Sequence, residues 1–145
     1  MPAPSSHRAG WLTWTLIPLA VAGITALWVL AALYSERQCS WMAVIAALDA
    51  LWVQGFSSPR SPARRAFVAV LATAATILLA NWIVAATYAG GQVGLSPWDA
   101  TLRLGAGHAL TLAGLANSWQ DTAWLGLGLA VAVLVPFLSG RRPAP

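Results

Sequence analysis

The sequence predicts an all-α, polytopic membrane protein with four transmembrane helices and both termini on the cytoplasmic side. Of its 145 residues, 59% are hydrophobic and only 8% are charged, whereas an ordinary soluble domain has about 25% charged residues. So few charges cannot cover a water-exposed surface. The apolar residues also gather into runs separated by short polar stretches. Lipid is therefore expected to cover a single domain, with room for four spans of about 20 residues each.

The predicted spans are about 11–34, 41–55, 66–88 and 122–138, and disordered tails are predicted at 1–10 and 140–145. The first run is uncharged and has about 24 residues, enough to cross about 30 Å of hydrocarbon at helical rise. A cleaved signal peptide is the alternative for this run, but the apolar part of a signal peptide has only about 7 to 15 residues. The second run carries Asp49, the third carries Asn81, and the fourth carries Pro136 near its end, where a lost backbone hydrogen bond matters least.

The arginines predict the orientation, because cations in short loops are retained in the cytoplasm. With the N-terminus inside, the inner side holds Arg8, Arg60, Arg64, Arg65, Arg141 and Arg142. The outer side holds Arg37 and Arg103. This bias predicts a multi-pass protein with both ends in the cytoplasm. The small size and the use of arginine for every cation indicate a bacterial inner membrane. The arginines do not line one face, so nucleic acid is not expected as a partner despite the net charge of +4.

The nine tryptophans are expected mainly at the membrane interfaces, because an indole ring prefers the headgroup region. The inner boundary is predicted at Trp11, Trp14 and Trp52. The outer boundary is predicted at Tyr34, Trp41, Tyr88, Trp98, Trp119 and Trp124. A ligand cage is the alternative for so many tryptophans, but most of them lie at predicted span ends.

The long outer segment 89–121 is predicted to hold an amphipathic helix over 96–117 in the plane of the interface. Ser96 is its predicted N-cap, with proline in the first turn and Asp99 three residues on. Asp99 and Arg103 are four residues apart, so they could pair on the helix surface.

His108 falls on the apolar side of that helix, where it would face the bundle. Two alternatives stay open for the segment: a fifth span, and a re-entrant hairpin bent at 105–107. A fifth span would bury Arg103 and His108 and would move the C-terminal arginines outside, so the interfacial helix is preferred.

Asp49 is the most informative residue, because a carboxylate near the bilayer centre costs about 2.5 to 3.5 kcal/mol on insertion scales. Counted from Trp41 and Tyr88, Asp49 and Asn81 lie at similar depths, roughly 10 to 12 Å at helical rise. An intramembrane polar pair is therefore predicted. Three interpretations stay open: a proton or cation site supported by the amide, a structural hydrogen bond between helices, and contact of Asp49 with a cation of another subunit.

Small residues at helical spacing predict close helix contacts. They form the stripe Ala69, Thr73, Thr76 and Ala80 on the third span, and the pairs Gly126 with Ala130 and Gly128 with Ala132 on the fourth.

The residues needed for cofactor chemistry or catalysis are few. Cys39 is the only cysteine, and His7 and His108 lie in opposite segments, so no disulfide, bis-histidine haem or zinc site is expected. No nucleophile elbow or phosphate loop is present either, so neither a cofactor nor an enzyme is predicted.

The function predicted from the sequence is that of a non-catalytic accessory or scaffold subunit of a larger membrane assembly. Its expected partners are the lipid bilayer and another membrane protein or a second copy of the chain. The alternative is a small proton-coupled transporter or channel that works through Asp49.

Overall fold

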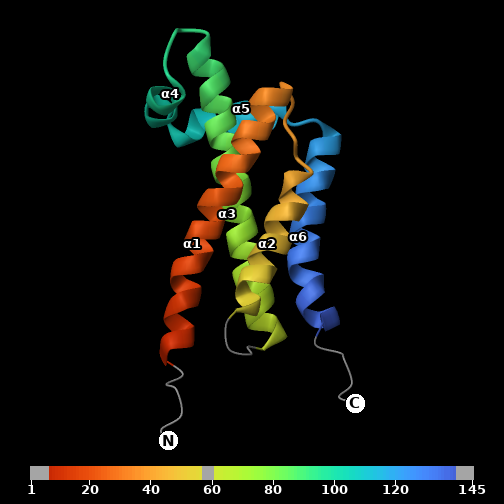
Figure 1. Cartoon of the computed structure of the whole chain (residues 1–145). Helices are drawn as coiled ribbons and strands as arrows, with labels where there is room; N and C mark the ends of the chain where they lie inside the picture. The colour runs from red at the N-terminus through yellow and green to blue at the C-terminus, as the bar shows by residue number, and fades with distance from the viewer. Residues whose placement is uncertain (1–6, 57–60, 140–145) are drawn as a thin grey trace, which may run out of the picture.

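The chain folds into a helical bundle in the computed structural model, which describes residues 7–56 and 61–139 (Figure 1). The elements are α1 (His7–Ser35), α2 (Met42–Gly55), α3 (Pro62–Gly91), α4 (Pro97–Arg103), α5 (Ala106–Ala116) and α6 (Trp119–Ser139). Over these described ranges every regular element is a helix, as the sequence predicts.

In the described part of the chain, three helical segments are long and apolar enough to cross a membrane, namely Trp14–Ser35, Pro62–Gly91 and Trp119–Ser139. Met42–Gly55 and Gly107–Ala116 are apolar but shorter. At 1.5 Å per residue, the 14 residues of α2 extend about 21 Å, less than the roughly 30 Å of a hydrocarbon core.

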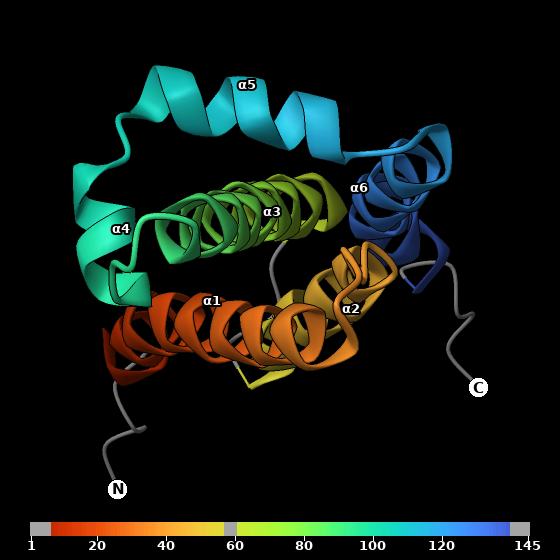
Figure 2. The ribbon, with the colours of Figure 1, turned by 90° about the horizontal axis from the view of Figure 1, so that it is seen from above.

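The four longer helices α1, α2, α3 and α6 run side by side along the bundle, and α1 begins at the same end where α6 finishes (Figure 1). Helices α4 and α5 lie across the opposite end. Seen from that end, α3 runs between α5 on one side and α1 and α2 on the other (Figure 2). Helix α3 packs against each of the other five helices, and α6 packs against α2 and α3.

Small residues allow the close packing around α3. The predicted stripe on this helix is buried throughout: Ala69, Thr73, Thr76 and Ala80 are at most 2% exposed. The two pairs predicted on α6 differ in burial. Gly128 and Ala132 face α2 and the core, whereas Gly126 and Ala130 are exposed.

Serine caps set the starts of three helices. Ser61 and Ser96 each precede a proline and accept a hydrogen bond from the backbone N–H three residues on. Ser118 and Asp121 form a reciprocal cap at α6: the Ser118 N–H donates to Asp121 Oδ2 at 3.0 Å, and the Asp121 N–H donates to Ser118 Oγ at 3.3 Å.

Helix ends differ from the predicted spans by several residues. Helix α1 already begins at His7, inside the stretch predicted as a tail, and α3 runs from Pro62 to Gly91 rather than over 66–88. The Ser61 cap explains the early start of α3, because proline is favoured at the first position of a helix. The rest of the predicted tails, 1–6 and 140–145, lies outside the described residues.

The single helix predicted over 96–117 is instead two helices. Leu104 and Gly105 are extended, with ψ of 107° and 151°, and they separate α4 from α5. The chain bends there because the close contact of Ala100 with Gly90 holds α4 against the end of α3. Helix α5 then runs along the side of α3 that lies opposite α1 and α2 (Figure 2).

A substitution at Gly128 tests the contact between α2 and α6. A Cβ at this position would meet the backbone of Ala43 at 2.7 Å, whereas a Cβ at Gly126 would meet nothing within 4 Å. We expect Gly128→Ala to lower the free energy of unfolding by about 1 to 3 kcal/mol, the usual effect of overpacking. The matched change Gly126→Ala should leave it unchanged or raise it slightly, because alanine favours helix. Reversible unfolding in mixed micelles measures both, and equal stabilities of the two variants would contradict the contact.

Candidate functional site

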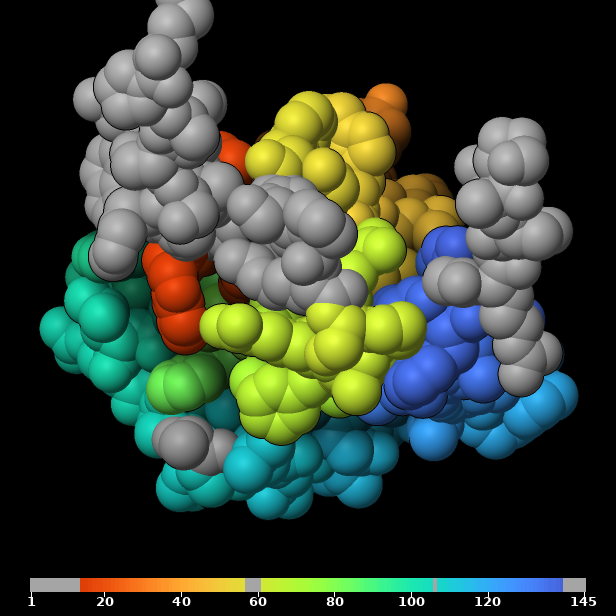
Figure 3. Space-filling view, turned by 90° about the horizontal axis from the view of Figure 1, so that it is seen from below, coloured from red at the N-terminus to blue at the C-terminus, as the bar shows by residue number. Residues whose placement is uncertain are grey.

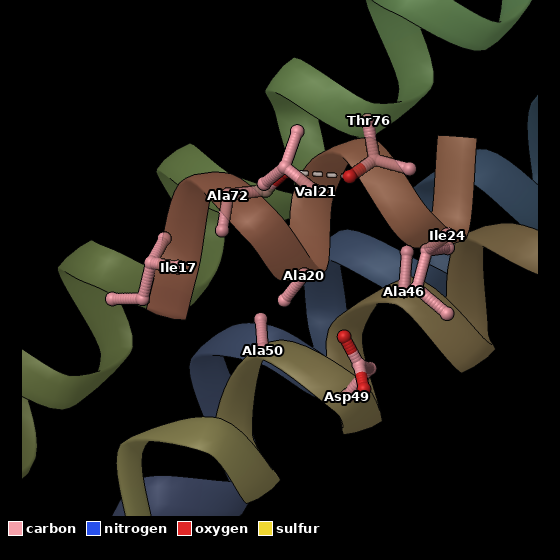
Figure 4. Close-up of a pocket in the computed structure, with 9 residues that line it drawn as sticks. All are labelled: Ile17, Ala20, Val21, Ile24, Ala46, Asp49, Ala50, Ala72 and Thr76. Atoms are coloured by element: carbon pink, nitrogen blue, oxygen red, sulfur yellow. Dashed lines mark hydrogen bonds between the residues drawn. The ribbon is translucent and has the colours of Figure 1, made fainter. Parts of the chain in front are cut away.

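Asp49 lies on the side of α2 that faces α1, and it is half-buried (Figure 4). It lines a cavity of about 10 Å³ together with Ile17, Ala20, Val21, Ile24, Ala46, Ala50, Ala72 and Thr76. The one polar neighbour, Thr76, donates its hydroxyl hydrogen bond to the Ala72 carbonyl oxygen at 3.0 Å. Among the residues that the structure describes, no hydrogen bond or ion pair reaches the Asp49 carboxylate.

The pair predicted between Asp49 and Asn81 is not formed. The residue of α3 that lines the Asp49 cavity is Thr76, and Asn81 lies five residues further along the helix, about 7.5 Å away at helical rise. The prediction counted both depths from aromatic residues, as if α2 and α3 ended at the same level. The ends of the two helices are staggered, so the two side chains lie at different levels. The two polar groups therefore have separate surroundings.

Asn81 instead belongs to an amide cluster, which consists of Gln38, Asn81 and Asn117. The Gln38 Nε2 donates to Asn81 Oδ1 at 2.7 Å, and the Asn117 Nδ2 donates to the same oxygen at 3.2 Å. The Asn81 Nδ2 donates to the Ile77 carbonyl oxygen at 2.9 Å. The cluster joins the α1–α2 connection, α3 and the α5–α6 connection.

Trp28 extends the amide cluster into the core. Its ring is 1% exposed, and its Nε1 donates to the Gln38 carbonyl oxygen at 2.9 Å. This indole is therefore a core side chain that fixes the α1–α2 connection.

Ser40 and Asp121 make a second link at the same end of the bundle. The Ser40 hydroxyl is buried and donates to Asp121 Oδ1 at 2.8 Å. The other carboxylate oxygen accepts the Ser118 hydroxyl at 2.6 Å as part of the α6 cap. Asp121 thus ties the α1–α2 connection to the start of α6.

An apolar recess of about 270 Å³ opens beside the amide cluster, between α3 and α5. It is lined by Gln38, Val84, Ala85, Tyr88, Ala89, Leu112 and Ala116. The Gln38 amide is bonded to Asn81, and the Tyr88 hydroxyl donates to the Ala32 carbonyl oxygen at 3.4 Å. Because both polar groups of the wall already have partners, the recess offers mainly apolar contact.

The residues predicted on the outer amphipathic helix lie at its surface but do not come together. Asp99 accepts the Ser96 hydroxyl at 2.6 Å, and in the described structure it makes no ion pair with Arg103. His108 is exposed rather than turned toward the bundle, and the buried position next to it is Ala109. The break at Gly105 rotates α5 relative to α4. Residues of the two helices therefore do not share the faces that one continuous helix would give them.

The arginines that predict the topology are only partly described. Arg64 is exposed and Arg65 is half-buried in the first turn of α3. Arg8 belongs to the first turn of α1. Arg60, Arg141 and Arg142 lie outside the described residues. In the described structure, α1 and α3 begin at the same end of the bundle (Figure 1).

The sequence analysis did not identify Gln38, Ser40 and Asn117 as paired polar residues. All three stand in short connections, where a polar side chain is normally solvated, so a single sequence gives no signal that they are paired inside the bundle.

No group of three or more His, Cys, Asp or Glu side chains is placed to hold a metal ion in the part of the chain that the structure describes. No family model, curated protein or solved structure matches the chain.

Two double-mutant cycles test these contacts. For Gln38→Ala with Asn81→Ala, we expect a coupling energy of about 0.6 kcal/mol, typical of a hydrogen bond in a membrane protein and at most about 1.7 kcal/mol. For Asp49→Ala with Asn81→Ala, we expect no measurable coupling, because the side chains are apart. Unfolding free energies of the single and double variants in mixed micelles give both values. Coupling in the second cycle but not in the first would restore the pair predicted from the sequence.

Proposed function

We propose that the chain is a non-catalytic accessory or scaffold subunit of a larger membrane assembly. In this proposal it lies in a bacterial inner membrane as four spans with both termini in the cytoplasm. The observation that carries the proposal is the Asp49 carboxylate, which has no partner within residues 7–56 and 61–139 and lies beside an exposed apolar face of α2.

The α2 outer face consists of Trp41, Ile45, Leu48, Trp52 and Phe56, which are 37% to 67% exposed. They are spaced three or four residues apart, so they form one stripe along the helix. The Trp52 and Phe56 rings meet edge to face, with centroids 4.8 Å apart at 82°. Such a rigid aromatic and aliphatic surface suits packing against another helix.

Asp49 borders this face, four residues after Ile45 and three before Trp52. In hydrocarbon an ionisable side chain normally faces a partner or a water-filled cavity. The proposed partner helix brings a cationic side chain to the level of Asp49, and the ion pair offsets the cost of placing the carboxylate in the membrane. Loss of either charge then leaves the other one buried and unpaired.

The proposed topology rests on the three long apolar helices and on the antiparallel course of α2 among them (Figure 1). A span as short as α2 is accommodated by local thinning of the bilayer or by association with other helices. The exposed Trp14 and Trp52 lie toward the end where α1 begins, and the exposed Trp98 and Trp119 lie toward the opposite end. These positions fit two interfacial belts.

A proton-coupled transporter also depends on Asp49, but it has less support. The cavity at this carboxylate, about 10 Å³, has room for roughly one water molecule. Its lining is apolar apart from Asp49 and Thr76. Only the transporter alternative predicts a pH-dependent flux in proteoliposomes that is lost with Asp49→Asn.

Labelling of single cysteines tests the four-span topology. In a Cys39→Ser background, a membrane-impermeant maleimide should label Arg37→Cys and Val93→Cys in intact cells, because both sites are exposed at the outer end. Ala63→Cys, exposed at the start of α3, should react only after the membrane is permeabilised. Labelling of Ala63→Cys and Arg37→Cys from the same side would remove α2 as a span.

Site-specific photo-crosslinking in the native membrane tests the partner. A photoreactive residue at Leu48 on the α2 outer face should give one adduct with a distinct membrane protein in stoichiometric amount. The control position is Leu127 on α6, which is equally exposed at 47% against 50% for Leu48. It should give only diffuse products.

The same photo-crosslinking assay tests whether the Asp49 charge is needed for binding of the partner. Asp49→Asn should abolish the Leu48 adduct by removing the ion pair, and Asp99→Asn, an acid on the exposed helix α4, should leave the adduct intact. Repeated recovery of a bare monomer, or an adduct that is insensitive to Asp49→Asn, would overturn the proposal.

A further inference from the structure

A long apolar groove runs along the contact between α1 and α3, with an arginine at one end. Its volume is about 550 Å³. Its lining includes Trp14, Ile17 and Ala22 of α1, and Arg64, Leu71 and Leu79 of α3. Figure 3 views the end where these helices start, with the first described side chains of α1 (red) beside the start of α3 (yellow-green).

The length of the groove matches one leaflet of a bilayer. From Arg64 to Leu79 the groove follows α3 for about 22 Å at helical rise. One leaflet of a bilayer is about 20 to 22 Å thick with its headgroup region, and about 15 Å of this is hydrocarbon. The groove therefore begins at headgroup level and ends near the bilayer centre. A single acyl chain lying in it would contact hydrocarbon side chains over its whole length.

The charge at the groove's mouth favours an anion. Arg64 is the charged residue of the lining and is exposed there, and Trp14 stands at the same end with 75% of its surface exposed. Guanidinium groups bind phosphate oxygens through two parallel hydrogen bonds, and tryptophan marks the depth at which phosphates lie.

We propose that this groove binds one anionic phospholipid, with an acyl chain between α1 and α3 and the headgroup phosphate on Arg64. The groove and the α2 outer face lie on different helix surfaces, so this inference does not depend on a protein partner. It holds whichever side of the membrane this end of the bundle faces, because both leaflets present phosphates at that depth.

Lipid binding is measured by native mass spectrometry of the purified chain titrated with phosphatidylglycerol or phosphatidylcholine of identical acyl chains. We expect the wild type to retain one phosphatidylglycerol in preference to phosphatidylcholine. Arg64→Gln should lower the affinity for phosphatidylglycerol about fivefold, the usual contribution of one arginine at an anionic surface. It should lower the affinity for phosphatidylcholine less, because the choline cation offsets the charge of the phosphate in that lipid. Arg103→Gln, at the opposite end of the bundle, is the matched control and should change neither affinity.

A second pair of variants separates the acyl chain from the headgroup. Ala22 lines the groove from an exposed position on α1, so Ala22→Trp should fill the groove and weaken binding of both lipids. Ala130→Trp, at an exposed position on α6, should leave both affinities unchanged. Thermal unfolding confirms that the variants are folded.

Three results would overturn the proposal. They are equal retention of the two lipids by the wild type, equal effects of Arg64→Gln and Arg103→Gln, and a dimer that dissociates with Ala22→Trp. The last result would show that a second copy of the chain, not a lipid, occupies the groove.

Discussion

The fold depends on the close approach of α3 to its neighbours. In hydrocarbon every backbone N–H and C=O must be bonded within its own helix, so helices can associate only through their side chains. Alanine and threonine on α3, and Gly128 on α6, keep those side chains short enough for the helices to touch. Since α3 packs against all five other helices, its small residues determine where each of them lies.

The polar contacts between elements are concentrated at the end opposite the start of α1. The amide cluster and the Ser40–Asp121 hydrogen bond both hold the α1–α2 connection there. Toward the other end, Gln54 donates to the carbonyl oxygen of Arg65 at 3.3 Å and so links α2 to α3. The bundle is thus closed firmly at one end, while α1 and α3 leave the open groove at the other. The proposed sites for a partner helix and for a lipid lie along the apolar length between these ends.

The all-helical class and the positions of the long apolar helices could be predicted from the sequence, because hydrophobic runs of that length have few other structures available. The buried stripe on α3 could also be predicted, since small residues at helical spacing indicate close contact. The partners of Asn81 could not, because they come from Gln38 and Asn117 in connections distant in sequence. A bend at 105–107 was considered only as part of a re-entrant hairpin. The break observed between α4 and α5 goes with the packing of Ala100 on Gly90, which local propensity does not report.

The Ser40–Asp121 hydrogen bond has a consequence for biosynthesis. Its two residues are 81 positions apart, and Asn81 receives the Asn117 amide from 36 positions downstream. Until the last helix has left the ribosome and entered the bilayer, the Ser40 hydroxyl lacks the acceptor that it has in the finished molecule, and the Asn81 oxygen has only one of its two side-chain donors. A nascent chain that ends before Asn117 therefore lacks the contacts that hold the α1–α2 connection to the start of α6, so this end of the bundle closes only when synthesis is nearly complete.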